Sequence, residues 1–196
     1  MNIALLKKGD QKTFRELIKA THGDIYKLAL KFTSDSNDAK DITQEVYLEA
    51  YNNIHKFRED SGIKTWLYRI TVNRSLNMIK RNKTKFDSVS IDENFGEAKN
   101  IFLSSQYEAD KPLENKELKF LLNDALSKIP EKQRVSFLLF NHDGLTYKEI
   151  AEILNISHSA VESLIFRAKA NLRKILGDYY KNNYKSAQVF KTNNVK

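Results

Sequence analysis

Residues 146–176 read TYKEIAEILNISHSAVESLIFRAKANLRKIL, and this stretch decides the fold of the second half of the chain. Thr146 is followed three residues later by Glu149, a capping-box pattern that starts a helix. Apolar residues recur three and four positions apart on both sides of Asn155, as in two helices joined by a short turn. Ala151 is small, which a steep crossing of two helices requires. The stretch therefore predicts a helix-turn-helix.

The second helix of this motif is the candidate DNA-reading element. We expect it to begin at Ser157 or Ser159, to run to about Leu176, and to bury Val161, Leu164, Ile165, Ala168 and Leu172. Its other face can enter a major groove, where arginine pairs bidentately with guanine. An ordinary helical hairpin with a solvated charged face is the alternative. The residues expected at the DNA are Ser159, Glu162, Ser163, Phe166, Arg167, Lys169, Ala170 and Arg173.

Composition favours an all-helical protein with a polyanionic partner. The 196 residues include only two prolines and six glycines, so few positions break a helix. Thirty-three Lys and Arg against 25 Asp and Glu give a net charge of +8, which fits nucleic acid but is shared by many ribosomal and membrane-surface proteins. The absence of cysteine excludes disulfides and thiolate zinc sites. No apolar run suits a signal peptide or a membrane span, so we expect a cytoplasmic protein.

Hydrophobic periodicity divides the chain into two small helical domains. In the first we expect a helix capped by Asp10, a second capped by Asp38 or Ser36, and a third over about residues 64–81. Residues 84–112 are acidic and show no sustained period, which is typical of a flexible linker. Further helices are expected over about 114–128 and from Pro130, at the first helical position, to Gly144. The expected division is 1–83, linker 84–112, 113–177, and a basic disordered tail 178–196.

A basic, aromatic stretch precedes the linker. Residues 61–86 contain seven lysines and arginines and no acidic residue. Cations bind phosphates, aromatic rings stack on unpaired bases, and asparagine can hydrogen-bond a base edge. A solvated face over a packed tryptophan is the alternative. The candidate residues here are Lys64, Trp66, Arg69, Asn73 and Arg74.

An acidic helix face is the third feature. Once Ile42 and Val46 are buried, an exposed leucine lies among acidic residues on a basic protein, which suggests a protein-binding surface. A plain solvated face is the alternative. The outward residues are Asp41, Gln44, Glu45, Leu48 and Glu49.

The sequence contains no catalytic constellation. Its four histidines are scattered without metal-ligand spacing, and neither a glycine-rich phosphate loop nor a nucleophile elbow occurs. We therefore expect no enzyme activity, no metal and no cofactor.

The three features in this order resemble the sigma-70 family of RNA polymerase sigma factors, specifically its extracytoplasmic-function (ECF) group. The carrying motifs are DAKDITQEV at 38–46, FREDS at 57–61, KTWLYRI at 64–70 with Asn73, LSKIPEKQR at 126–134, YKEIAEILNIS at 147–157 and VESLIFRAKANL at 161–172. The resemblance covers about residues 10–175. Two departures occur, since Glu162 and Leu164 stand where the family often has a cation.

The resemblance implies an all-α sigma factor that binds core RNA polymerase, promoter DNA and an anti-sigma factor. It adds Asp38 to the polymerase-binding set, and it adds Phe57, Arg58 and Ser61 to the residues that hold the melted minus-ten strand. The helix-turn-helix would read the minus-thirty-five element. The runner-up is a free-standing helix-turn-helix regulator that binds duplex DNA as a dimer. An RNA-binding protein fits less well, because the major groove of A-form RNA does not admit a helix.

Overall fold

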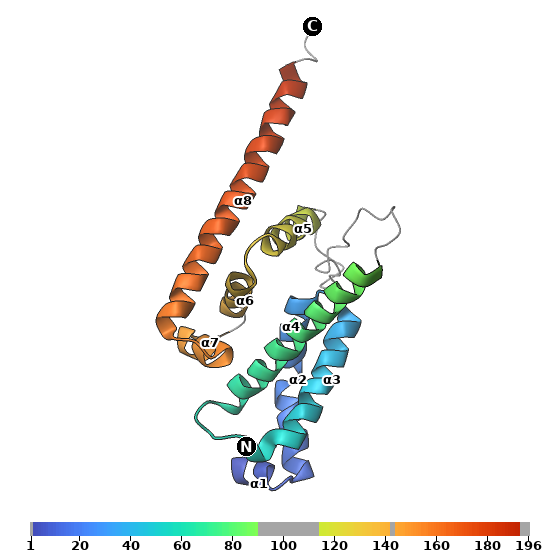
Figure 1. Cartoon of the computed structure of the whole chain (residues 1–196), viewed down its shortest axis with the longest axis vertical. Coiled ribbons are helices and arrows are strands. Elements are labelled where there is room, and N and C mark those ends of the chain that lie inside the picture. The colour runs from blue at the N-terminus through green and yellow to red at the C-terminus, as the bar shows by residue number, and fades with distance from the viewer. Residues whose placement is uncertain (1, 90–113, 142–143, 193–196) are drawn as a thin grey trace.

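The computed structural model describes residues 2–89, 114–141 and 144–192, and within these ranges the chain is helical and has no strand (Figure 1). It forms two helical units, as the sequence predicts. The first contains α1 (Ile3–Lys7), α2 (Gln11–Thr33), α3 (Ser36–Asn53), the short 3-10 helix η1 (Ile54–Lys56) and α4 (Ile63–Val89). The second contains α5 (Glu114–Ser127), α6 (Glu131–Phe140), α7 (Tyr147–Leu154) and α8 (His158–Thr192).

Helices α2, α3 and α4 pack on one another and form the N-terminal unit (Figure 1). The expected stripe of α3 is fully buried, with Ala39, Ile42 and Val46 each 0% exposed. Asp10 caps α2 as predicted, because its carboxylate accepts from the Thr13 backbone N–H at 2.7 Å. This packing leaves one face of α3 and one face of α4 toward solvent.

The corner between α2 and α3 differs from the prediction. Ser34 is left-handed, with φ 56°, and ends α2 at once. Asp35 then caps α3 by accepting from the N–H groups of Asn37 and Asp38 at 2.7 and 3.0 Å. The prediction of Asp38 or Ser36 as the cap was wrong. The left-handed Ser34 turns the chain as soon as α2 ends, so the next residue, Asp35, already caps α3.

The C-terminal unit is built on α8, against which α5, α6 and α7 pack. The predicted helix-turn-helix is α7 and α8, and Asn155, with φ 53°, ends α7 in the left-handed conformation. Ser157 accepts from the Ala160 N–H at 3.2 Å and so caps α8. Pro130 occupies the cap position of α6 rather than its first turn. Helix α6 ends at Phe140, before the predicted limit at Gly144.

Two helices are longer than the sequence pattern suggested. Helix α4 continues to Val89 instead of ending near residue 81, and α8 continues to Thr192, although we expected residues 178–196 to be disordered. The α4 extension contains neither proline nor glycine, and α8 passes through Gly177 without interruption, so no proline ends either helix there. The remainder of the predicted acidic linker, residues 90–113, lies outside the described residues.

Helix α1 was not predicted, because five residues are too few to show a period. It is nevertheless anchored, since Leu6 is 1% exposed. Lys7 reaches Glu59 at 2.5 Å and ties α1 to the loop between η1 and α4.

Replacing Thr146 with alanine should lower the free energy of unfolding by about 0.5–2 kcal/mol. The Thr146 hydroxyl accepts from the Glu149 N–H at 3.2 Å, and the Glu149 carboxylate accepts from the Thr146 N–H at 2.8 Å. An eight-residue helix such as α7 depends on its caps, because it is too short to be stable alone. Urea unfolding measures the loss. Lys148→Ala, exposed in the same helix, is the control, and equal stability of the two variants would contradict the role of the cap.

Candidate nucleic-acid and protein interfaces

All eight residues predicted to read DNA from the helix-turn-helix lie exposed on α8. Phe166 is the most open of the large apolar side chains, at 74% exposure. Lys169 lies with its ammonium 4.2 Å from the centre of the Phe140 ring. His158 approaches the Glu162 carboxylate at 3.8 Å. The opposite stripe is buried as expected except for Leu164, which is half-buried.

Part of this face borders a cavity of about 580 Å³. Ser159, Ser163 and Arg167 of α8 line it, and so does Asn73 of α4. Two predicted DNA-binding surfaces, one from each unit, thus face the same hollow.

The loop before α4 and the first turns of that helix carry the predicted minus-ten residues. Phe57 is buried at 5% exposure and packs on Trp66 with ring centres 5.4 Å apart, so both rings belong to the packed side of the loop. Arg58 is exposed and Ser61 half-buried. The Lys64 ammonium pairs with Asp24 of α2 at 2.6 Å, which raises the pKa of Lys64.

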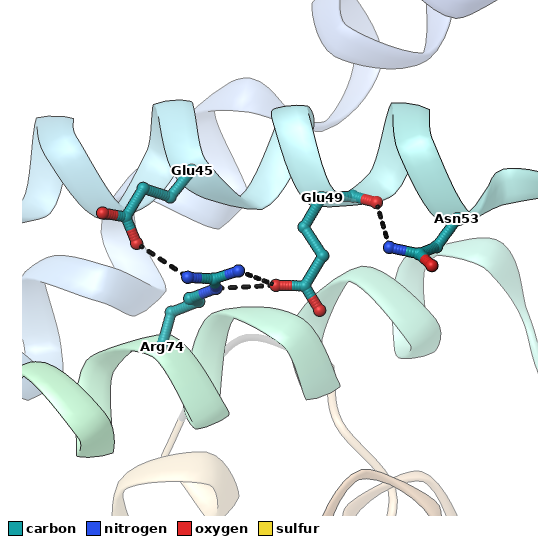
Figure 2. A network of polar contacts seen from close by, with 4 residues as sticks. All are labelled: Glu45, Glu49, Asn53 and Arg74. Carbon is teal, nitrogen blue, oxygen red and sulfur yellow. Dashed lines mark hydrogen bonds and ion pairs between the residues drawn. The ribbon is translucent and has the colours of Figure 1, made fainter.

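Arg74 is engaged by two carboxylates of α3 (Figure 2). Its Nε donates to Glu49 at 2.6 Å and its Nη1 to Glu45 at 3.3 Å. The hydrogen bond to Glu49 raises the pKa of Arg74. Asn53 donates to the Glu49 carbonyl at 3.0 Å and completes the network in Figure 2. Arg74, which is predicted to bind DNA, thus contacts two residues that are predicted to bind core polymerase.

Arg69 is engaged in a different way. Its Nη2 donates to the backbone carbonyl of Glu152 in α7, at 2.6 Å. This hydrogen bond crosses from the N-terminal to the C-terminal unit.

The predicted protein-binding face of α3 is open. Asp41, Gln44 and Glu45 are exposed, and Leu48 is 65% exposed. Burial, followed by the neighbouring charges of Asp35 and Asp41, raises the pKa of Asp38 at the start of the helix. An apolar groove of about 460 Å³ runs beside this face, between α2 and α3. Its lining residues are Phe14, Ile18, His22, Thr43, Gln44, Tyr47, Leu48 and Tyr51.

Sequence reasoning missed the partners of the cations. Asp24, Glu59 and the carbonyl of Glu152 carry no signal in the sequence, because each becomes a partner only through the packing of two helices. The α2–α3 groove could have been suspected from Tyr51, an aromatic residue on the outer side of the α3 period.

Within the described ranges, no helix is long and apolar enough to cross a membrane. The same residues contain no cluster of three or more histidine, aspartate and glutamate side chains that could hold a metal ion.

Comparison with known proteins identifies the class. Residues 17–85 match the family model for sigma-70 region 2, and residues 119–172 match that for sigma-70 region 4. The chain is 33% identical to the ECF RNA polymerase sigma factor SigW of Bacillus subtilis over 181 residues, which cover 90% of this chain and 95% of that protein. It is also 33% identical to the ECF RNA polymerase sigma-E factor of Escherichia coli over 171 residues, 84% and 86% of the two chains.

The chain therefore belongs to the sigma-70 family, in its ECF group, and is a sigma factor that directs RNA polymerase to promoters. Solved structures agree on the fold. CnrH in complex with the cytosolic domain of CnrY matches with a TM-score of 0.63 and 22% identity, over 90% of this chain and 95% of that one. The sigma factor RpoE in complex with the anti-sigma factor NepR, from Bartonella quintana, matches with a TM-score of 0.65 and 20% identity, over 85% and 98%.

Proposed function

We propose that the three exposed faces divide the work of promoter-specific initiation. The α3 face binds core RNA polymerase through Asp38, Asp41, Gln44, Glu45, Leu48 and Glu49. The loop after η1 and the outer side of α4 hold the melted minus-ten strand, and Arg58, Lys64 and Asn73 are the exposed candidates. The exposed face of α8 reads the minus-thirty-five element. Residues 1–83 and 113–177 act as separate binders, and residues 84–112 join them.

The observation that carries this proposal is the exposure of the whole predicted reading face of α8 above a buried stripe. In a helix-turn-helix, the recognition helix presents base-reading side chains to the major groove while its other side packs on its own domain. Val161, Ile165, Ala168 and Leu172 supply that anchor, each at most 4% exposed.

Two further features follow from this role. The chain acts in the cytoplasm, where promoter DNA and polymerase are, and it supplies recognition rather than catalysis. An anti-sigma factor is its regulator, a proposal supported by two similar folds that were each solved with a partner, the cytosolic domain of CnrY and the anti-sigma factor NepR.

Run-off transcription from a genomic promoter library tests the function as a whole. Core polymerase with this chain should give transcripts from a small set of promoters that core polymerase alone leaves silent. A free-standing regulator would instead bind its site alone and yield no transcript with core polymerase. That outcome would overturn the proposed function.

Asn73→Ala should reduce promoter opening more than promoter binding. Asn73 is exposed on α4, and an amide can hydrogen-bond the edge of an unpaired base, which exists only after melting. Permanganate reactivity of thymines measures opening, and a filter assay of the closed complex measures binding. Asn77→Ala, exposed one turn further along, is the control. Equal losses in both steps would show that Asn73 contributes only to general affinity.

A further inference from the structure

The loop between η1 and α4, residues 57–62, contains a glutamate in an unfavourable backbone conformation. Glu59 has φ 63°, in the left-handed region that glycine and asparagine adopt readily and that other residues rarely enter. The two other non-glycine residues with positive φ in the described part of the chain, Ser34 and Asn155, end helices, and their backbone N–H groups donate to the preceding turn. Glu59 ends no helix, since η1 already stops at Lys56. Its conformation therefore depends on another contact.

Helix α1 supplies such a contact to Glu59. The Lys7 ammonium lies 2.5 Å from the Glu59 carboxylate, with the two side chains 31% and 53% exposed. Lys7 is held in place by its helix, because its neighbour Leu6 is 1% exposed and belongs to the same hydrophobic cluster as Ile54 and Phe57. Helix α1 also contacts η1 directly. An anchored helix thus presents the lysine to the loop.

The backbone of Glu59 determines how its neighbours are displayed. Exposed Arg58 precedes it and half-buried Ser61 follows two residues later, and both are candidates for holding the minus-ten strand. A change of φ at Glu59 to a negative value would turn Ser61 relative to Arg58. The ion pair with Lys7 also neutralises a carboxylate that would otherwise repel a phosphate beside these residues.

We propose that Lys7 of α1 is a positioning residue for minus-ten recognition, because it holds Glu59 in the left-handed conformation and so presets the loop 57–62. The proposal rests on the proposed function for the identity of the strand that the loop holds. Lys7 acts through Glu59 and not through contact with DNA. A loop that is already ordered loses less conformational freedom when it binds, so the contact favours strand capture.

Replacing Lys7 with methionine removes the ammonium and keeps a side chain that favours a helix. Loss of one exposed ion pair should weaken promoter opening roughly 2- to 5-fold. Permanganate reactivity of thymines in the minus-ten element measures it, with holoenzyme that contains the full chain. The matched control is Lys8→Met, which removes the same charge from the next, exposed position and should open promoters as the parent does. Both variants should bind core polymerase with unchanged affinity.

Two double variants separate the loop conformation from the charge. Adding Glu59→Asn to Lys7→Met introduces a residue that favours the left-handed conformation, whereas Glu59→Gln is equally uncharged and has no such preference. The variant with asparagine should recover most of the lost opening, and the variant with glutamine should not. Recovery by both would show that Lys7 only neutralises Glu59. Recovery by neither would show that Lys7 does not act through the conformation of Glu59, and either result would overturn the proposal.

The single tryptophan of the chain reports on the loop without promoter or polymerase. Trp66 is half-buried, and its ring lies 5.4 Å from that of Phe57, the first residue of the loop. Acrylamide should quench its fluorescence more strongly in Lys7→Met than in the parent and in Lys8→Met. Addition of Glu59→Asn should restore the parent's quenching, and addition of Glu59→Gln should not.

The quenching separates a failure of this proposal from a failure of the proposed function. Equal quenching of Trp66 in the parent and in Lys7→Met would overturn the positioning role of Lys7, whatever the promoter experiments give. A run-off library that yields no promoter would count against the proposed function, while the quenching would still decide whether Lys7 positions the loop.

Discussion

A chain carrying Asp41→Lys and Leu48→Ala should bind core RNA polymerase at least about 30-fold more weakly than the parent, a loss of about 2 kcal/mol. Leu48 is 65% exposed and borders the apolar groove between α2 and α3, so it can act as an apolar anchor for a partner. Asp41 is exposed on the same helix, and an interface of opposite charge orients docking. Titration of labelled sigma factor with core polymerase measures the loss.

The design leaves Glu45 unchanged, because Glu45 contacts Arg74 and its reversal would also disturb α4. Leu5→Ala with Glu16→Lys is the matched control, since it removes an exposed leucine and reverses an exposed acid outside the α3 face. Circular dichroism verifies that both variants remain helical. Undiminished affinity of the Asp41→Lys, Leu48→Ala chain would remove the α3 face as the docking surface.

Arg167→Ala should cost roughly 1–3 kcal/mol in promoter affinity and relax selection at one base pair of the minus-thirty-five element. Arg167 is exposed on the third turn of α8, four residues after Ser163, so the two share a face. A guanidinium on that face can donate two hydrogen bonds to one guanine, and alanine can donate none.

Lys169→Ala serves as the contrasting variant. Its ammonium lies over the Phe140 ring, away from the cavity-lining face, and suits a phosphate. Its loss should weaken all sequences about equally and lower the salt slope by about one unit. Selection of promoters that each variant holoenzyme binds, from a pool with a randomised minus-thirty-five element, separates the base-reading role from the phosphate-binding role. An unchanged base preference with uniformly weaker binding of the Arg167→Ala chain would show that Arg167 only neutralises phosphate.

The sequence predicted the helix-turn-helix well, because its signals are local. Thr146 and Glu149 cap each other within one turn, and Asn155 tolerates the left-handed conformation that ends α7. The helix ends at Val89 and Thr192 were not predicted, because no local signal in the sequence marks them. No proline lies just after either predicted end, α8 continues through Gly177, and polarity alone does not say where a helix stops.

The partners of the cations could not be predicted. A lysine or arginine on the outer face of a helix can meet water, a phosphate, or an acid on a neighbouring helix, and only the crossing of the helices decides. Lys64 meets Asp24 and Arg74 meets Glu49 in this way, whereas Arg69 meets a backbone carbonyl in the other unit. Counting charges along residues 61–86 therefore does not reveal which cations have a partner within the protein.

If α3 binds core polymerase and α4 binds DNA, as proposed, the Arg74 network couples these two binding events thermodynamically. Its guanidinium N–H groups donate to Glu45 and Glu49 on the face proposed for polymerase, and Arg74 itself lies on the helix proposed for DNA. Any ligand that draws these carboxylates away releases a cation on α4, and any ligand that occupies the cation releases the carboxylates. Reciprocity requires each to raise the affinity for the other by the same factor. On the proposed function, these two ion pairs would make polymerase docking and strand capture cooperative without any change in the path of the backbone.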